Sequence, residues 1–259
     1  MIKLTRVASE ISNAPKVFIL SGGPGISSLT LRNLDLLKRS FELIYLDMQG
    51  TNDSLYEGKK TFSELCILIG DTIKKEVGEK YILGHSYGGF LAAGIFQKNT
   101  LASGLICIAT PFSKESLTIA NDTYNSNKTP SLSDAENTWG EKQDDLSFAK
   151  WLSEYGALYF KNHKAKELLL NDKVSARFFK DNRSDITNEV FPLEHLEKIK
   201  LPKIFIAGKE DKLLLSEVLK NDALAGGFNF FEVEDASHFV TVDQPEKVAG
   251  LIEKHLLRR

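Results

Sequence analysis

The chain has 259 residues, of which 42% are apolar and 26% charged, and its formal net charge is -2. This balance is typical of a globular protein; it excludes a disordered or coiled-coil chain, and the lack of a basic surplus argues against nucleic acid as a partner. No apolar run reaches the length of a membrane-spanning helix and the first residues lack a secretory signal, so we expect a cytoplasmic protein without a membrane partner.

Short apolar runs alternate with helical patterns along most of the chain. Runs that are apolar on both faces favour strands of a parallel sheet covered by helices on each side. Such runs occupy residues 17–20, 41–46, 81–83, 105–109, 203–207 and 228–233. A capping box at Thr61–Glu64 predicts a helix that continues to Val77, and Pro245 marks the start of another helix. The alternation predicts an α/β fold with a doubly wound, mostly parallel sheet.

One long segment departs from this alternation. Between Pro111 and Pro202 no strand is predicted, and Phe148–Tyr159 has apolar residues at helical spacing. Residues 121–131 are rich in Asn, Ser and Thr and predict an exposed, mobile loop, after which a capping box at 133–136 predicts a helix start. The length alone fits two small domains equally well, but this pattern favours a core of residues 1–110 and 201–259 with a helical insertion of residues 111–200.

The segment Gly84–Gly88 has the pattern G-x-S-x-G of a nucleophile elbow. It follows a predicted strand and precedes an apolar helical segment. A sharp turn there would hold Ser86 in strained backbone geometry and expose its hydroxyl at the carboxyl end of a central strand, where the helix N-terminus directs partial positive charge. Ser86 is therefore the predicted nucleophile, and a glycine-rich helix start with an ordinary serine is the alternative.

A serine hydroxyl needs a base to take its proton, and the base needs a carboxylate to fix its tautomer. His238 follows the last predicted strand, at the edge where active sites of open α/β sheets form, and is the preferred base among five histidines. A structural histidine is the alternative. Asp211 follows strand 203–207 and gives the chain order Ser, Asp, His. Glu210 ranks second as the acid, and Asp235 third.

The oxyanion of a tetrahedral intermediate needs preorganised amide donors. Tyr87 supplies one N–H directly after the nucleophile. The loop Gly22–Gly25 follows the first long strand and can supply another, for which we favour Gly23, since Pro24 has no amide hydrogen. A phosphate-binding loop is the weaker interpretation, because no Lys-Ser or Lys-Thr pair follows the glycines.

These motifs make the chain resemble the α/β-hydrolase superfamily and, within it, the proline iminopeptidase branch. That branch carries H-G-G-P-G at the oxyanion loop, D-Q-x-G-x-G-x-S after the next strand and G-H-S-Y-G-G at the elbow. The counterparts here are residues 21–25, 47–54 and 84–89. The resemblance implies the α/β-hydrolase fold, a triad of Ser86, Asp211 and His238, and a helical cap that covers the triad.

The chain also departs from that branch. Ser21 stands where the branch has histidine, and Met48 and Asn52 change the second motif. Family aminopeptidases bind the substrate amine with acidic residues, often one directly after the catalytic aspartate, where this chain has Lys212. The resemblance therefore implies the fold and the triad rather than prolyl specificity.

The insertion offers two sets of candidate substrate-binding residues. Its aromatic side chains could line an apolar pocket or simply pack the cap on the core; they are Trp139, Trp151, Tyr155, Tyr159 and Phe160. Its acidic residues could hold a substrate amine or form a solvated helix face; they are Glu136, Glu141, Asp144 and Asp145.

The favoured hypothesis is a serine hydrolase that cleaves an ester or amide of a small molecule or short peptide through an acyl-enzyme. The motifs favour an iminopeptidase-like enzyme, whereas Ser21 and Lys212 favour a small-molecule carboxylesterase. A non-catalytic ligand-binding member of the fold is the third hypothesis. No metal or organic cofactor is expected, since His and Cys do not cluster at ligand spacing. Cys66 and Cys107 lie in apolar contexts and are expected to be buried free thiols.

Overall fold

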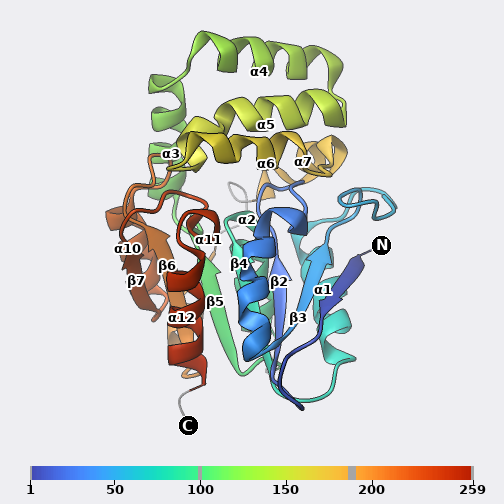
Figure 1. The fold of residues 1–259 in the computed structure, drawn as a ribbon, viewed down its shortest axis with the longest axis vertical. Helices are drawn as coiled ribbons and strands as arrows, with labels where there is room; N and C mark the ends of the chain where they lie inside the picture. Colours follow the sequence, from blue (N-terminus) through green and yellow to red (C-terminus); the bar gives the residue numbers. More distant parts are fainter. Residues whose placement is uncertain (1, 99–100, 186–190, 258–259) are drawn as a thin grey trace.

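The computed structural model describes residues 2–98, 101–185 and 191–257 (Figure 1). Seven strands form one sheet in the order β1-β3-β2-β4-β5-β6-β7. All neighbouring strands are parallel except β1, which pairs antiparallel with β3. The strands are β1 (Lys3–Val7), β2 (Lys16–Leu20), β3 (Glu42–Asp47), β4 (Lys80–His85), β5 (Gly104–Ile108), β6 (Lys203–Gly208) and β7 (Asn229–Val233).

Helices cover both faces of the sheet. One face packs against α1 (Phe62–Lys74), α2 (Tyr87–Lys98) and α10 (Ser216–Ala225). The other packs against the 3-10 helix η1 (Ser28–Arg39), α11 (Val240–Asp243) and α12 (Pro245–Leu256). Each central strand contributes to both layers: in β2, Phe18 lies in the first hydrophobic cluster and Val17 and Ile19 in the second. Strands β2 to β6 are therefore buried on both faces, as their apolar runs predict, whereas the edge strands β1 and β7 are partly exposed.

The six strands predicted from apolar runs are present. The structure adds β1, which was not among them. Its residues Lys3–Val7 alternate between half-buried and exposed positions, because the strand lies at the sheet edge. The short polar sequence Lys-Leu-Thr-Arg-Val shows little of the hydrophobic signal used for the other strands. The prediction for the two cysteines is confirmed, since Cys66 and Cys107 are buried and form no disulfide.

The segment between β5 and β6, called the cap below, forms helices, most of which lie over the carboxyl ends of the parallel strands (Figure 1). Its last helix instead packs beside the sheet, against α2 and α10. Among its described residues the cap contains no strand. Its helices are α3 (Lys114–Ser126), α4 (Pro130–Lys142), α5 (Asp145–Tyr159), η2 (His163–Lys166), α6 (Glu167–Leu170), α7 (Ala176–Asn182) and α9 (Leu193–Lys198). Within the described ranges, no helix of the molecule is long and apolar enough to cross a membrane.

Three predicted helix boundaries are wrong. Helix α3 continues to Ser126, so much of the predicted mobile loop is helical. Helix α4 starts at Pro130 rather than near Ser133, because the Thr129 hydroxyl accepts the Leu132 N–H and the proline occupies the first turn. Helix α1 ends at Lys74, and Val77 is 80% exposed instead of extending its apolar face.

Candidate active site

Ser86 lies at a tight turn between β4 and α2. Its φ angle is 53°, a left-handed conformation that costs a non-glycine residue about 1–2 kcal/mol. The Ser86 N–H donates to the Ile108 carbonyl at 2.8 Å, which ties the turn to β5. A Cβ on Gly88 would lie 2.3 Å from the Leu20 carbonyl oxygen, so only glycine lets α2 begin this close to β2. The elbow geometry predicted from the sequence is therefore present.

His238 and Asp211 meet at the carboxyl ends of β7 and β6. His238 Nδ1 lies 2.9 Å from Asp211 Oδ2, and both residues are buried. The other oxygen, Asp211 Oδ1, accepts the N–H groups of Leu213 and Leu214, each at 2.9 Å. An ionised carboxylate only accepts hydrogen bonds, so Nδ1 carries the proton and Nε2 is left as the basic nitrogen. Glu210 is 45% exposed and pairs with a lysine instead.

Two further side chains hold His238. The Tyr159 ring from α5 stacks on the imidazole at a centroid distance of 5.0 Å and an interplanar angle of 25°. His85 Nε2 donates to the His238 carbonyl at 3.0 Å. Burial and the adjacent His238 lower the pKa of His85 to about 3, so His85 is neutral near pH 7. The predictions did not identify this role of His85, because it depends on a contact 153 residues away.

The glycine loop after β2 lies directly beside the elbow. A Cβ on Gly22 would approach the Ser86 Cβ to 3.1 Å. Ser21, where the iminopeptidase motif has histidine, closes this loop by donating its hydroxyl to the Ile26 carbonyl at 2.7 Å. Gly23 has a φ of 108° and precedes Pro24 in the same loop.

Tyr87 connects the elbow to the cap. It is the first residue of α2, where backbone N–H groups point outward beyond the helix N-terminus. Its hydroxyl donates to Asp185 of the cap at 2.7 Å, and its ring packs edge-on against Phe178 of α7. The residue after the predicted nucleophile therefore contacts both the core and the cap.

The second iminopeptidase-like motif has a structural role here. Asp47, fully buried at the end of β3, accepts the Ser28 N–H at 2.7 Å and the Ser28 hydroxyl at 3.0 Å. The Asn52 side chain donates to the same carboxylate at 2.8 Å. Asp47 thus anchors the start of η1, which follows the glycine loop.

A carboxylate of the cap binds Ser27, the residue before Ser28. Asp172 is 9% exposed and accepts the Ser27 N–H at 2.8 Å, and its other oxygen accepts the Ser27 hydroxyl. Next to it, the Ser175 N–H donates to the Gly25 carbonyl at 2.8 Å. These contacts span about 145 residues of sequence and hold the cap on the glycine loop.

Asp172 predicts a pH-dependent stability. Burial, with a smaller contribution from the Asp47 charge, raises the pKa of Asp172 from 3.8 to about 6. The folded protein therefore binds this proton more tightly than the unfolded chain. The contribution of Asp172 to the free energy of unfolding is fully present below pH 4 and is lost as pH rises through 6, by up to about 3 kcal/mol. Asp172→Asn keeps an acceptor and a donor for Ser27 without a charge. Urea unfolding at pH 4.5, 6 and 7.5 should therefore show the variant gaining stability relative to wild type with rising pH, and parallel pH profiles would contradict this.

The predicted aromatic residues of the cap occupy different places. Trp139 is 8% exposed and packs on Phe148 inside the cap. Trp151 also packs on Phe148 and donates its indole N–H to the Tyr124 hydroxyl at 3.2 Å. Tyr155 stacks on the Tyr124 ring at 4.8 Å. Tyr155 also contacts Tyr159, another of the five predicted aromatic residues, whose ring stacks on His238. Tyr159 therefore contacts His238 directly, and Tyr155 reaches it through Tyr159.

The acidic residues of the cap mostly have structural partners. Glu136 pairs with Lys128. Asp144 caps α5 by accepting the Ser147 N–H at 2.7 Å, and Asp145 accepts the Ala176 N–H at 2.7 Å. Lys212, the residue after Asp211, is exposed.

Residues 28–251 match the alpha/beta hydrolase family, which is most of the chain. The chain belongs to that family. This establishes the hydrolase fold with its helical insertion, and leaves the substrate to be inferred from the site. Within the part of the chain that the structure describes, no group of three or more His, Cys, Asp or Glu could hold a metal ion.

Several solved structures of similar fold are described as esterases or lactonases. An esterase from Exiguobacterium antarcticum superposes with a TM-score of 0.72 at 16% identity, covering 99% of this chain and 96% of its own. An esterase from Thermogutta terrifontis superposes with a TM-score of 0.69 at 16% identity, covering 99% of this chain and 93% of its own. The enol-lactonase from Burkholderia xenovorans superposes with a TM-score of 0.71 at 14% identity, covering 99% of this chain and 96% of its own. At this identity the likeness concerns the fold. No protein with a curated description matches the sequence.

Proposed function

We propose that the protein is a serine hydrolase that cleaves small carboxylic esters through an acyl-enzyme on Ser86. The observation that carries the proposal is the bond from His238 Nδ1 to Asp211, which leaves Nε2 as a base, in a chain whose Ser86 has elbow geometry. The buried Asp211 carboxylate fixes this tautomer and stabilises the imidazolium once a proton is taken.

The proposed reaction has two halves. His238 Nε2 takes the proton of Ser86 as its Oγ attacks the ester carbonyl, and the N–H groups of Gly23 and Tyr87 stabilise the oxyanion. His238 then gives the proton to the leaving alcohol, and the acyl-enzyme forms. Water enters, loses its proton to His238 and attacks the acyl carbonyl; the proton returns to Ser86 as the acid leaves.

The cap favours an ester over a peptide with a free amine. An aminopeptidase needs an acidic side chain that is available to the substrate amine, whereas three of the four predicted carboxylates, Glu136, Asp144 and Asp145, are engaged in contacts within the cap. The fourth, Glu141, is exposed near the end of α4. The similar structures described as esterases and an enol-lactonase agree with this choice. An N-terminal aminopeptidase is the second candidate, favoured by the motifs at residues 22–25 and 84–89.

Labelling with a fluorophosphonate probe tests the nucleophile. The wild type is expected to be labelled with one equivalent of probe and Ser86→Ala not at all, because the probe traps an activated serine hydroxyl. Equal labelling of both proteins would rule out the proposed role of Ser86. Saturable ligand binding without labelling or turnover would instead indicate a non-catalytic binding protein.

A substrate panel separates the two hydrolase candidates. The wild type is expected to hydrolyse p-nitrophenyl acetate and butyrate with kcat/KM at least about tenfold above prolyl and alanyl arylamides. The opposite order would favour the aminopeptidase.

A further inference from the structure

The segment that carries His238 is bound to the end of cap helix α5. The Phe239 N–H donates to the Tyr159 carbonyl at 3.0 Å, and the Ser237 hydroxyl donates to the Leu158 carbonyl at 3.3 Å. His238 therefore lies between two residues that are bonded to the same helix, and the Tyr159 ring of that helix stacks on its imidazole.

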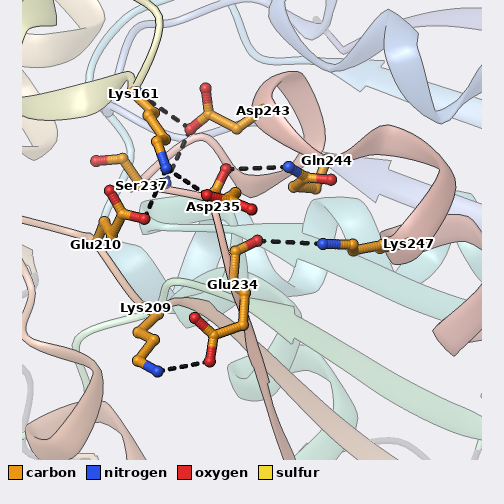
Figure 2. Close-up of polar contacts among 9 residues, drawn as sticks. All are labelled: Lys161, Lys209, Glu210, Glu234, Asp235, Ser237, Asp243, Gln244 and Lys247. Carbon is orange, nitrogen blue, oxygen red and sulfur yellow. Dashed lines mark hydrogen bonds and ion pairs between the residues drawn. The ribbon is translucent and has the colours of Figure 1, made fainter.

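Asp243, at the end of α11, joins the same two segments through one carboxylate oxygen (Figure 2). Its Oδ2 accepts the Ser237 N–H at 2.8 Å and the Lys161 N–H at 3.3 Å. Ser237 directly precedes His238, and Lys161 lies just beyond α5. Hydrogen bonds to an ionised acceptor are roughly twice as strong as neutral ones. One charged oxygen therefore fixes the spacing between the histidine segment and the end of α5.

We infer that Asp243 is a positioning residue for His238, an inference that rests on the proposed role of His238 as the general base. The imidazole is held on one side by Asp211 and on its face by Tyr159. In the proposed proton transfer, a relative shift of the two segments would displace Nε2 from the position that the Ser86 hydroxyl requires, and a displacement of about 1 Å between reacting groups can cost about 100-fold in rate. Asp243 prevents that shift without touching the substrate.

The ion pairs around Lys161 have a lesser part in this arrangement. Its Nζ lies 2.7 Å from Glu210 and 2.6 Å from Asp235 (Figure 2). The three side chains are 40%, 45% and 64% exposed, and exposed pairs of this kind contribute little, because water and salt screen them. Replacing the Lys161 side chain leaves its backbone N–H on Asp243. Lys161→Met therefore separates the effect of the ion pairs from the effect of the backbone hydrogen bonds to Asp243.

Four variants test the inference. Asp243→Ala should lower kcat on p-nitrophenyl acetate by about 10- to 100-fold, with KM within about threefold, and slow fluorophosphonate labelling in parallel. Asp243→Asn keeps a neutral acceptor and should lose about two- to tenfold. Lys161→Met should lose less than about threefold. Glu246→Gln removes a 68% exposed carboxylate of the same region and is the matched control with unchanged kinetics.

The results separate positioning from a purely structural role. A loss of thermal stability with wild-type kcat and labelling rate in the Asp243 variants that fold would overturn the inference, as would a Lys161→Met loss as large as that of Asp243→Ala. If Asp243→Ala does not fold, Asp243→Asn decides: reduced kcat at unchanged KM supports the inference, and wild-type kcat overturns it. A wild type that the probe does not label would defeat the proposed function itself.

Discussion

Replacing Asp211 by asparagine is expected to lower kcat for ester hydrolysis by about 1,000- to 10,000-fold with little change in KM. The N–H groups of Leu213 and Leu214 require an acceptor, so the amide oxygen of the new side chain must stay on them. Its NH2 group would then face His238 Nδ1 and donate to it. The imidazole proton would move to Nε2, which could no longer take the proton of Ser86.

Steady-state kinetics on p-nitrophenyl acetate, with circular dichroism to verify folding, measure this effect. The matched control is Glu210→Gln, which neutralises the adjacent but exposed carboxylate and should keep kcat within about twofold. A kcat for Asp211→Asn within tenfold of the wild type would mean that another carboxylate orients the base.

The second large effect concerns stability. Gly88→Ala would place a Cβ 2.3 Å from the Leu20 carbonyl oxygen and 2.5 Å from the Ser21 carbonyl oxygen, and both are backbone atoms that cannot rotate away. Helix α2, in which residues 87–96 are all buried, would have to move off β2. We expect the free energy of unfolding to fall by about 3 kcal/mol or more, with loss of fluorophosphonate labelling because the elbow and the glycine loop separate.

Gly140→Ala is the matched control for this substitution. Gly140 lies in α4, and a Cβ there would have no atom within 4 Å. Alanine in the interior of an exposed helix should raise stability by about 0.5–1 kcal/mol. Urea unfolding of both variants compares the two, and a Gly88→Ala protein as stable as the wild type would contradict the close packing of the elbow.

The local features of the site could be predicted from the sequence, because they depend on neighbouring residues. The turn at Ser86 could be predicted from the glycines two positions away on each side, and from the predicted strand before it and the predicted helix after it. The positions of Asp211 and His238 follow from the strands that precede them, because parallel strands end at the same edge of the sheet.

The contacts that support the site could not be predicted in this way. Asp172 binds Ser27 across 145 residues, and Asp243 binds Lys161 across 82. Such pairs depend on how the cap packs on the core, and an aspartate in a polar stretch has the same local signal whether it caps a helix, faces water or bonds a distant amide. Trp139 shows the converse, since its aromatic character fits a pocket and the interior of the cap equally well.

The bonds between α5 and the histidine segment bear on how this fold can be engineered. The cap carries the aromatic residues predicted to bind substrate, which makes it an attractive segment to exchange. Here the end of α5 provides the carbonyls of Leu158 and Tyr159 and the ring that covers the imidazole. A chimera that replaces the whole cap would also replace part of the scaffold that holds His238, the proposed base. A graft that ends before residue 158 would change the preceding cap helices and leave that scaffold native.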